Sequence, residues 1–209
     1  MRPEPITSIY SLRDPDEIRR RLEILQADHI APLTGYVDHL RASLGRKKQI
    51  PYFDPLDGGI NASILFLLEA PGPKAVESGF VSRDNPDPTA RNMNQLLTIC
   101  GVPRWMTVLW NIVPWHVDRG GSLRPVNQEE INAGLGHLKS LRPLLPNIRA
   151  VVLVGGKARN ARPAVEALFH TRVFTCPSPS QRVLNVWPEK RGEIISVFRK
   201  AVRLSLDKD

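Results

Sequence analysis

The chain has 209 residues, 42% of them hydrophobic, so it can bury a continuous core. Its net charge of +8 favours polyanionic partners, because cations that neutralise phosphates release condensed counterions. With only Cys100 and Cys176, the sequence excludes a disulfide framework, a cysteine-rich zinc site and a four-cysteine iron–sulfur cluster. No apolar run approaches the roughly twenty residues of a membrane span, so we expect no membrane contact and a cytoplasmic location.

The first 50 residues predict helices. Residues 14–17, Asp-Pro-Asp-Glu, are typical of a helix start, with acidic side chains in the first turn. Apolar residues then recur at helical spacing from Ile18 to Tyr36, and Pro32 is expected to divide this stretch into two helices. The second helix is expected to end near Gly45, before a turn-rich loop.

Four short apolar runs predict the strands of a sheet. Two of them are continuous rather than alternating in polarity, which is typical of strands covered on both faces. The predicted strands are residues 64–68, 107–113, 150–154 and 172–175, and the predicted helices among them are 91–100, 128–144, 157–169 and 188–206. This alternation predicts an α/β fold, a three-layer α/β/α sandwich with a central four-stranded parallel sheet. We expect residues 1–209 to form a single domain, with residues 1–50 as an N-terminal helical part packed on it.

The loops that follow the predicted strands are the places where such sheets bind ligands. They contain Glu69-Ala70-Pro71-Gly72, Asn111 to His116, Gly155-Gly156 and Cys176-Pro177-Ser178-Pro179. In this order, from Ile64 to about Asn185, they resemble the motifs of the uracil-DNA glycosylase superfamily. The resemblance implies that the chain flips a damaged base out of DNA and binds it at this edge of the sheet.

The resemblance implies roles for individual residues in binding the base. Phe80 stands where the family stacks a Phe on the flipped base, with an ordinary core Phe as the alternative. Asn111 stands where the family hydrogen-bonds the base edge, with an Asn satisfied by the loop backbone as the alternative. Ala70, Gly72 and Cys176 are expected to line the same pocket. Cys176 replaces a His that stabilises charge developing on the base, and a thiol is a weaker donor.

The last strand-end loop is expected to hold the DNA backbone. It comprises Pro177, Ser178, Pro179, Ser180, Gln181 and Arg182. Serine hydroxyls and backbone amides could contact phosphates, while Gln181 or Arg182 enters the space that the base vacates. The alternative is a plain proline-rich turn.

Two carboxylates are candidates for stabilising the cationic sugar and orienting water. Ala70 stands where the best-known branch of the family has its water-activating Asp, so another residue must serve. We favour Asp84, because one branch carries an Asp shortly after its stacking Phe. Glu69 is the second candidate, with bracing of its loop as the alternative, and Asp87 is interpreted as a turn former. His116 is a further candidate for replacing the missing His or touching phosphate, with a structural role as the alternative.

We therefore expect a monomeric, monofunctional DNA glycosylase that needs no metal and no cofactor. It would hydrolyse the N-glycosidic bond of uracil or a related deaminated base in DNA, as a step of base excision repair. The alternative is a non-cleaving uracil-DNA-binding protein of the same fold, which Ala70 and Cys176 favour. A third hypothesis is an unrelated α/β enzyme that acts on small molecules.

Overall fold

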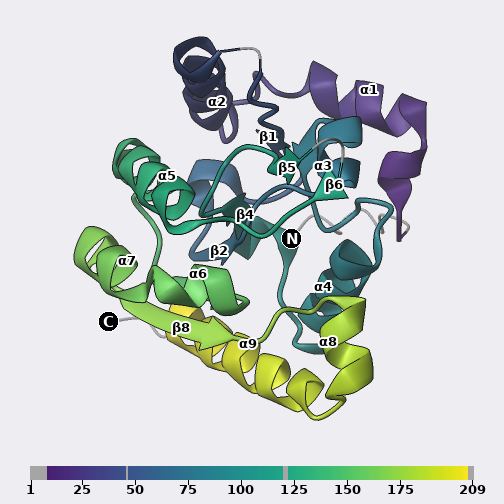
Figure 1. The fold of residues 1–209 in the computed structure, drawn as a ribbon, viewed down its shortest axis with the longest axis vertical. Helices are drawn as coiled ribbons and strands as arrows, with labels where there is room; N and C mark the ends of the chain where they lie inside the picture. Colours follow the sequence, from purple (N-terminus) through teal and green to yellow (C-terminus); the bar gives the residue numbers. More distant parts are fainter. Residues whose placement is uncertain (1–8, 46, 120–121, 207–209) are drawn as a thin grey trace.

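The computed structural model describes residues 9–45, 47–119 and 122–206 (Figure 1). Its central sheet has four parallel strands in the order β4-β2-β7-β8. They are β2 (Ile64–Leu68), β4 (Thr107–Asn111), β7 (Ala150–Val154) and β8 (Arg172–Cys176). The predicted four-stranded parallel α/β fold is therefore confirmed. The main difference is that β4 ends at Asn111, two residues before the predicted end.

The part of the chain that the structure describes contains nine α-helices. They are α1 (Pro15–Glu23), α2 (Ala31–Leu44), α3 (Pro73–Ser78), α4 (Pro88–Ile99), α5 (Gln128–Leu141), α6 (Gly156–Asn160), α7 (Arg162–Phe169), α8 (Gln181–Val186) and α9 (Lys190–Leu206). Short 3-10 turns span Ser11–Arg13, Gly59–Asn61, Arg104–Met106 and Arg142–Leu144. Two strand pairs lie outside the main sheet: β1 (Tyr52–Phe53) with β3 (Phe80–Val81), and β5 (Asp118–Arg119) with β6 (Ser122–Leu123).

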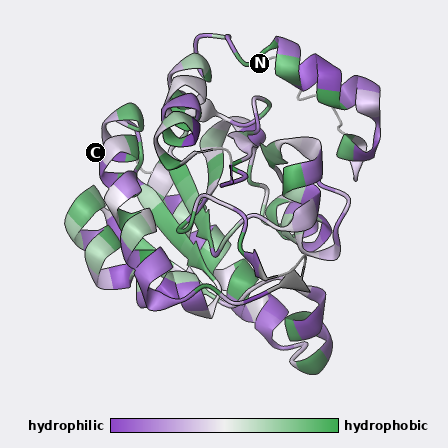
Figure 2. Cartoon of the chain, turned by 45° about the horizontal axis from the view of Figure 1, so that its top comes forward, coloured by the Kyte–Doolittle hydropathy of each residue, from purple (hydrophilic) through white to green (hydrophobic). Residues whose placement is uncertain are grey.

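Helices cover both faces of the sheet, which makes the three layers. On one face α9 runs along β7 and β8 and packs against α4 (Figure 1). Phe198 of α9 meets Phe66 of β2 edge to face, with ring centroids 5.0 Å apart. On the other face Tyr36 of α2 packs against Trp110 of β4, with centroids 6.1 Å apart. Figure 2 shows the hydrophobic strands at the centre and hydrophilic residues mostly on the outer sides of the helices.

Helix α5 fixes the chain that leaves β4. A Cβ atom on Gly134 would lie 2.0 Å from the carbonyl oxygen of Ile112, so only glycine allows the helix to approach this closely. The helix begins at a capping box, in which Asn127 and Glu130 each accept a backbone N–H of the other residue. The residues directly after Asn111 therefore have little freedom to move.

The N-terminal helices differ from the prediction at their junction. Pro32 does not divide them: the first helix ends at Glu23, and Pro32 lies in the first turn of α2, where a missing N–H costs nothing. Leu33, Val37 and Leu40 of α2 join the main core. Among the described residues, no helix combines the length and apolar character that crossing a membrane requires.

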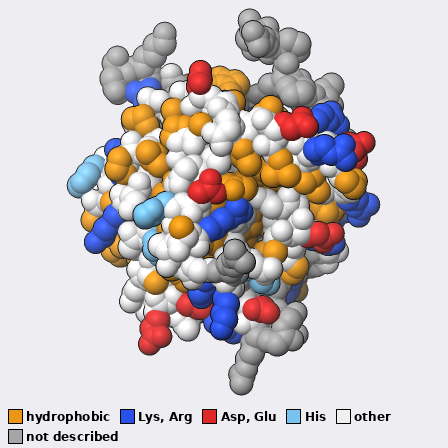
Figure 3. Space-filling model, turned by 90° about the horizontal axis from the view of Figure 1, so that it is seen from above, with side chains coloured by type: hydrophobic (Ala, Val, Ile, Leu, Met, Phe, Trp, Pro, Cys, Tyr) orange, Lys and Arg blue, Asp and Glu red, His pale blue; other side chains and the backbone are white. Residues whose placement is uncertain are grey.

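The excess positive charge is spread out on the face shown in Figure 3. Basic and acidic side chains alternate there among hydrophobic and neutral atoms. The net charge therefore does not gather into one basic patch on that face, and local geometry must locate the functional site.

Candidate functional site

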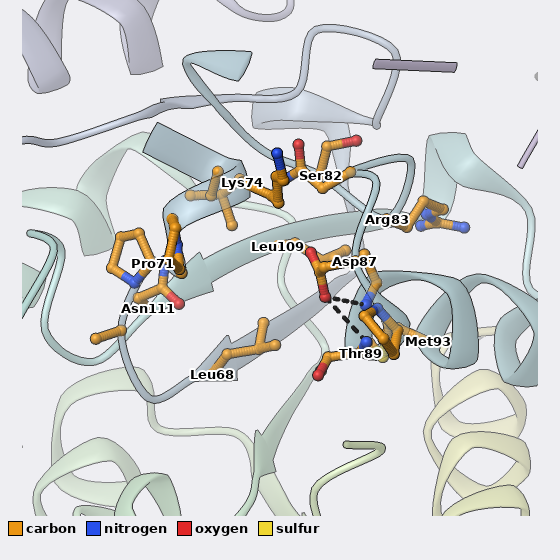
Figure 4. A pocket seen from close by; sticks show the side chains of 18 residues that line it. Leu68, Pro71, Lys74, Ser82, Arg83, Asp87, Thr89, Met93, Leu109 and Asn111 are labelled. Carbon is orange, nitrogen blue, oxygen red and sulfur yellow. Dashed lines mark hydrogen bonds between the residues drawn. The ribbon is translucent and has the colours of Figure 1, made fainter. Parts of the chain in front are cut away.

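A pocket of about 480 Å³ opens over the carboxyl ends of β2 and β4. Residues 68–75, without Glu69, form one wall and residues 81–90, without Asp84 and Pro86, form another. Met93 of α4 and the β4 side chains of Leu109 and Asn111 complete it (Figure 4). Its volume lies in the range of small-molecule sites, and most of its lining is apolar. This is the sheet edge where the sequence predicted a site.

Asn111 brings an unused hydrogen-bond donor to this pocket. The residue pairs in register with Leu68 and is 2% exposed. Its Nδ2 is buried and has no hydrogen-bond partner among the residues that the structure describes. An unmade bond of this kind costs about 1–3 kcal/mol, so an acceptor that enters the pocket would be bound favourably. The predicted placement of Asn111 at the site agrees with the structure.

The loop after β2 forms the adjacent wall of the pocket. Ala70, Pro71 and Gly72 line it, as the sequence predicted for Ala70 and Gly72. His116 holds this loop from outside, because its Nδ1 donates to the carbonyl oxygen of Pro71 at 2.8 Å. His116 is not among the lining residues, so its contacts support a positioning role.

Glu69 points away from the pocket. Its Oε1 accepts the backbone N–H of Val126 at 3.2 Å, and its backbone carbonyl accepts the N–H of Val113 at 3.0 Å. It is not among the residues that line the pocket. The structure therefore supports the bracing alternative for Glu69 rather than a catalytic role.

Phe80 does not face the pocket, which contradicts its expected stacking role. Its side chain is 0% exposed and packs in a second core cluster with Leu12 and Leu25. Val81, the next residue of β3, lines the pocket instead. Successive side chains of a strand point to opposite sides, so β3 cannot present both residues to one cavity.

Asp84 also faces away from the pocket, so its placement does not support its predicted role as the water-activating carboxylate. Its side chain is fully buried. Oδ2 accepts from Arg21 and from Arg104, at 2.7 Å each, and Oδ1 accepts from Asn94 at 3.0 Å. These three donors leave the carboxylate no access to a ligand.

Asp84 belongs to a group of six buried charges that we call the ionic cluster. Its members are Arg21, Asp54, Asp57, Arg83, Asp84 and Arg104. Desolvation would raise the pKa of Asp54, but Arg104 and Arg21 outweigh it and hold that pKa below its ordinary value. Burial lowers the pKa of Arg83. The ionic cluster fixes the segment that carries Val81 to Asp87, and so one wall of the pocket.

Asp57 is the least satisfied member of the ionic cluster. Burial raises its pKa to about 6, although Arg83 and Arg104 act in the opposite direction. The nearest guanidinium nitrogens of Arg104 and Arg83 lie 3.2 Å and 3.5 Å from Oδ1. Neither carboxylate oxygen has a hydrogen-bond partner among the described residues. Coulombic attraction alone therefore compensates for its burial.

Asp87 is the carboxylate that lines the pocket. It caps α4, because Oδ1 accepts the backbone N–H groups of Thr89 and Ala90 at 2.9 Å and 3.0 Å (Figure 4). The sequence favours a turn former at Asp87, although an Asp followed by Pro at the first helical position is also a capping signal. Lys74, which pairs with the exposed Glu77, lines the same pocket and was not predicted.

A second cavity lies beyond β7 and β8, and we call it the β8 cleft. It has a volume of about 340 Å³. Its lining residues are Gly155, Gly156, Arg159, Thr175, Cys176, Pro177, Ser178, Val183, Trp187, Lys190 and Glu193. This cavity and the Asn111 pocket lie at the same edge of the sheet, one over each half.

Cys176 lines the β8 cleft and not the pocket that holds Asn111. The residue is 6% exposed, and desolvation raises the pKa of its thiol to about 12. The thiol is thus neutral at physiological pH. Its expected place among the base-binding residues is wrong for this pocket.

The loop after β8 is short and well connected. Ser178 Oγ accepts from the N–H of Ser180, and the carbonyl of Pro179 accepts from Asn92 of α4 at 2.8 Å. Ser180 caps α8. Pro177 and Ser178 line the β8 cleft. Gln181 and Arg182, predicted as loop residues, form the first turn of α8 and are exposed.

The comparisons with known proteins identify the family. The family model described as "Uracil DNA glycosylase superfamily" matches residues 55–201. The chain belongs to the uracil DNA glycosylase superfamily. No curated protein sequence matches the chain.

Among solved structures, one similar chain is titled "Solution NMR Structure of a putative Uracil DNA glycosylase from Methanosarcina acetivorans". It is 16% identical, with a TM-score of 0.49, and the match covers 68% of this chain and 92% of that chain.

Proposed function

We propose that the chain is a DNA glycosylase that hydrolyses the N-glycosidic bond of uracil or a related deaminated base. Membership of the uracil DNA glycosylase superfamily supports the reaction class. The observation that carries the proposal is the buried, unpartnered Nδ2 of Asn111 in a largely apolar pocket at the sheet edge. A site of this kind suits a flat heterocycle with a carbonyl group.

The amide of Asn111 is complementary to the edge of uracil. Its Nδ2 can donate to the base O4, and its carbonyl oxygen can accept the base N3–H. Cytosine presents the reverse pattern, an amino group and an unprotonated ring nitrogen, and so would leave both amide atoms without partners in this orientation of the amide. Val81, Met93 and Leu109 provide apolar surface for the base.

Two charged residues of the pocket wall suit the charges that develop during cleavage. When the bond between the sugar C1′ and the base nitrogen breaks, its electron pair leaves with the base and the sugar becomes cationic. Asp87 can stabilise the cationic sugar and accept a proton from the water that attacks C1′. Lys74 can offset the negative charge on the departing base.

An excision assay tests the proposed function. A labelled oligonucleotide with one uracil is incubated with the protein, single-stranded or paired, and is then treated with alkali. We expect strand breaks at the uracil and none where cytosine replaces it. Asn111→Ala should reduce excision roughly tenfold to hundredfold. The exposed Asn160 of α6 lies outside both cavities, so Asn160→Ala is the control. No breaks in either form of uracil DNA would contradict the proposal.

The second candidate is a protein that binds uracil-containing DNA without cleaving it. One observation favours it: Cys176, at the position of the family's His, faces the β8 cleft with a neutral thiol. A shift of uracil DNA in a native gel, without strand breaks after alkali, would support this candidate over the glycosylase.

A further inference from the structure

The β8 cleft has a feature that the proposed chemistry does not use, an exposed tryptophan. Trp187 follows α8, is 50% exposed and lines the cleft. Its neighbour Val186 is 58% exposed. A large aromatic ring in water forgoes the burial that usually stabilises it, so such a ring is a candidate contact surface.

The backbone holds this ring in a defined place. The N–H of Trp187 donates to the carbonyl of Val183 at 2.9 Å, and its own carbonyl accepts from Lys190 at 3.0 Å. The backbone at Trp187 is therefore fixed between α8 and α9, so binding needs to order only the side chain.

The β8 cleft is large enough for one flat ring. Uracil has eight non-hydrogen atoms and would fill at most about 240 Å³, if each took the roughly 30 Å³ of a water molecule in the liquid. The cleft volume of about 340 Å³ exceeds this bound. Gly155 also lines the cleft, and its φ of +92° is one that residues with a Cβ rarely adopt.

The charges around the β8 cleft favour an anionic strand. Arg159, Lys190 and Glu193 line it, and Lys190 pairs with Glu193 at 2.7 Å, so Arg159 carries the uncompensated charge of the lining. Arg182 and Arg191 are exposed on the adjoining turns of α8 and α9. Among the residues that the structure describes, Arg159 and Arg182 form no salt bridge. A site with an exposed aromatic ring and several cations is typical of single-stranded nucleic acid binding.

We propose that the β8 cleft binds an unpaired base of the same DNA strand, stacked on Trp187, so that the chain prefers single-stranded over fully paired DNA. This inference rests on the proposed function. A stacking ring needs an open base face, which a duplex covers with neighbouring base pairs. The cleft and the Asn111 pocket lie two to three strand spacings apart, roughly 10–14 Å, so neighbouring nucleotides of one strand can reach both.

A pair of tryptophan variants tests this inference. Trp105 is 58% exposed and lies in the 3-10 turn before β4, at the other end of the strand, so Trp105→Ala is a matched control for Trp187→Ala. Dissociation constants are measured by fluorescence anisotropy for a uracil-containing oligonucleotide, alone and paired with its complement. We expect Trp187→Ala to weaken single-strand binding roughly 5- to 100-fold, and duplex binding by less than twofold. Trp187→Phe should retain most of the affinity, and Trp105→Ala all of it.

The outcomes separate this inference from the proposed function. Excision of uracil by the wild type, with unchanged single-strand affinity in Trp187→Ala, would overturn the inference and leave the function standing. Equal losses in both tryptophan variants, or equal losses for single strand and duplex, would also overturn it. Trp187-dependent binding of single strands without any excision would support the cleft and contradict the glycosylase.

Discussion

Residues 80–87 build two regions of opposite character, the Asn111 pocket and the ionic cluster. Val81 and Asp87 line the pocket, where the Asn111 amide has no partner among the described residues. Asp84 lies in the ionic cluster, where its carboxylate accepts three hydrogen bonds. A carboxylate with these bonds holds the wall of the pocket and is closed to a ligand, so the direction in which each side chain of the segment points decides what it can contact.

The ionic cluster is the rigid one of these two regions. Arg104 donates to both Asp54 and Asp84 at 2.7 Å, and Arg21 also pairs with both carboxylates. Buried charges are costly to separate, and the segment is therefore held in one conformation. Such rigidity is what a pocket needs if it is to hold a reacting ring without reorganising.

The largest effect, a loss of stability, should come from removing a charge of the ionic cluster. Asp84→Asn leaves two buried guanidinium groups short of negative charge, so we expect it to lower the free energy of unfolding by about 3–5 kcal/mol. Chemical denaturation monitored by circular dichroism measures this. A variant of wild-type stability that no longer excises uracil would restore Asp84 as the catalytic carboxylate.

Asp87→Asn tests the Asn111 pocket, because it should change the rate of excision and not the free energy of unfolding. Asn caps a helix about as well as Asp, so the stability should stay within about 0.5 kcal/mol of the wild type. Loss of the negative charge should slow excision roughly 10²- to 10³-fold. Single-turnover kinetics on uracil DNA give the rate, with Asp87→Ser as a second variant that keeps the cap. Undiminished excision in both variants would remove Asp87 from the mechanism.

The pH dependence of stability should reveal Asp57. Its folded pKa of about 6 lies above the ordinary 3.8, so the folded state holds this proton more tightly than the unfolded chain does. The stability contributed by the bound proton is complete below about pH 4 and is lost as the pH rises to 6. The two-unit shift corresponds to up to about 3 kcal/mol.

Asp57→Asn removes this titration and leaves the other members of the ionic cluster in place. The difference in unfolding free energy, variant minus wild type, should therefore increase by up to about 3 kcal/mol between pH 4 and pH 7. Urea denaturation at the two pH values measures this difference. A constant difference would mean that Asp57 titrates at its ordinary pKa.

The sheet could be predicted from sequence because its signal is local and periodic. The continuous apolar runs of β2 and β7 are typical of doubly covered strands, and both strands were found where expected. Helix α8 was missed, because its six residues follow a proline-rich loop and carry little periodicity. Pro32 was misjudged for a related reason: a proline divides a helix in its interior but is well tolerated in its first turn.

The site was predictable only in part. Asn111 could be found, because it directly follows an apolar run that ends at the functional edge of the sheet. The choices between Phe80 and Val81, and between Asp84 and Asp87, depend on which side each side chain faces. Contacts between residues distant in sequence set that side, above all the ion pairs of Asp84 with Arg21 and Arg104. No local sequence pattern predicts these contacts.

Arg21 also determines how far the chain can be shortened. The family match begins at residue 55, after both Arg21 and Asp54. A fragment trimmed to that match would retain Asp84 and Arg104 but lose two of the six charges that neutralise one another. We expect such a fragment to aggregate or unfold rather than act as a minimal enzyme, so family boundaries are a poor guide for choosing a fragment of this chain to express.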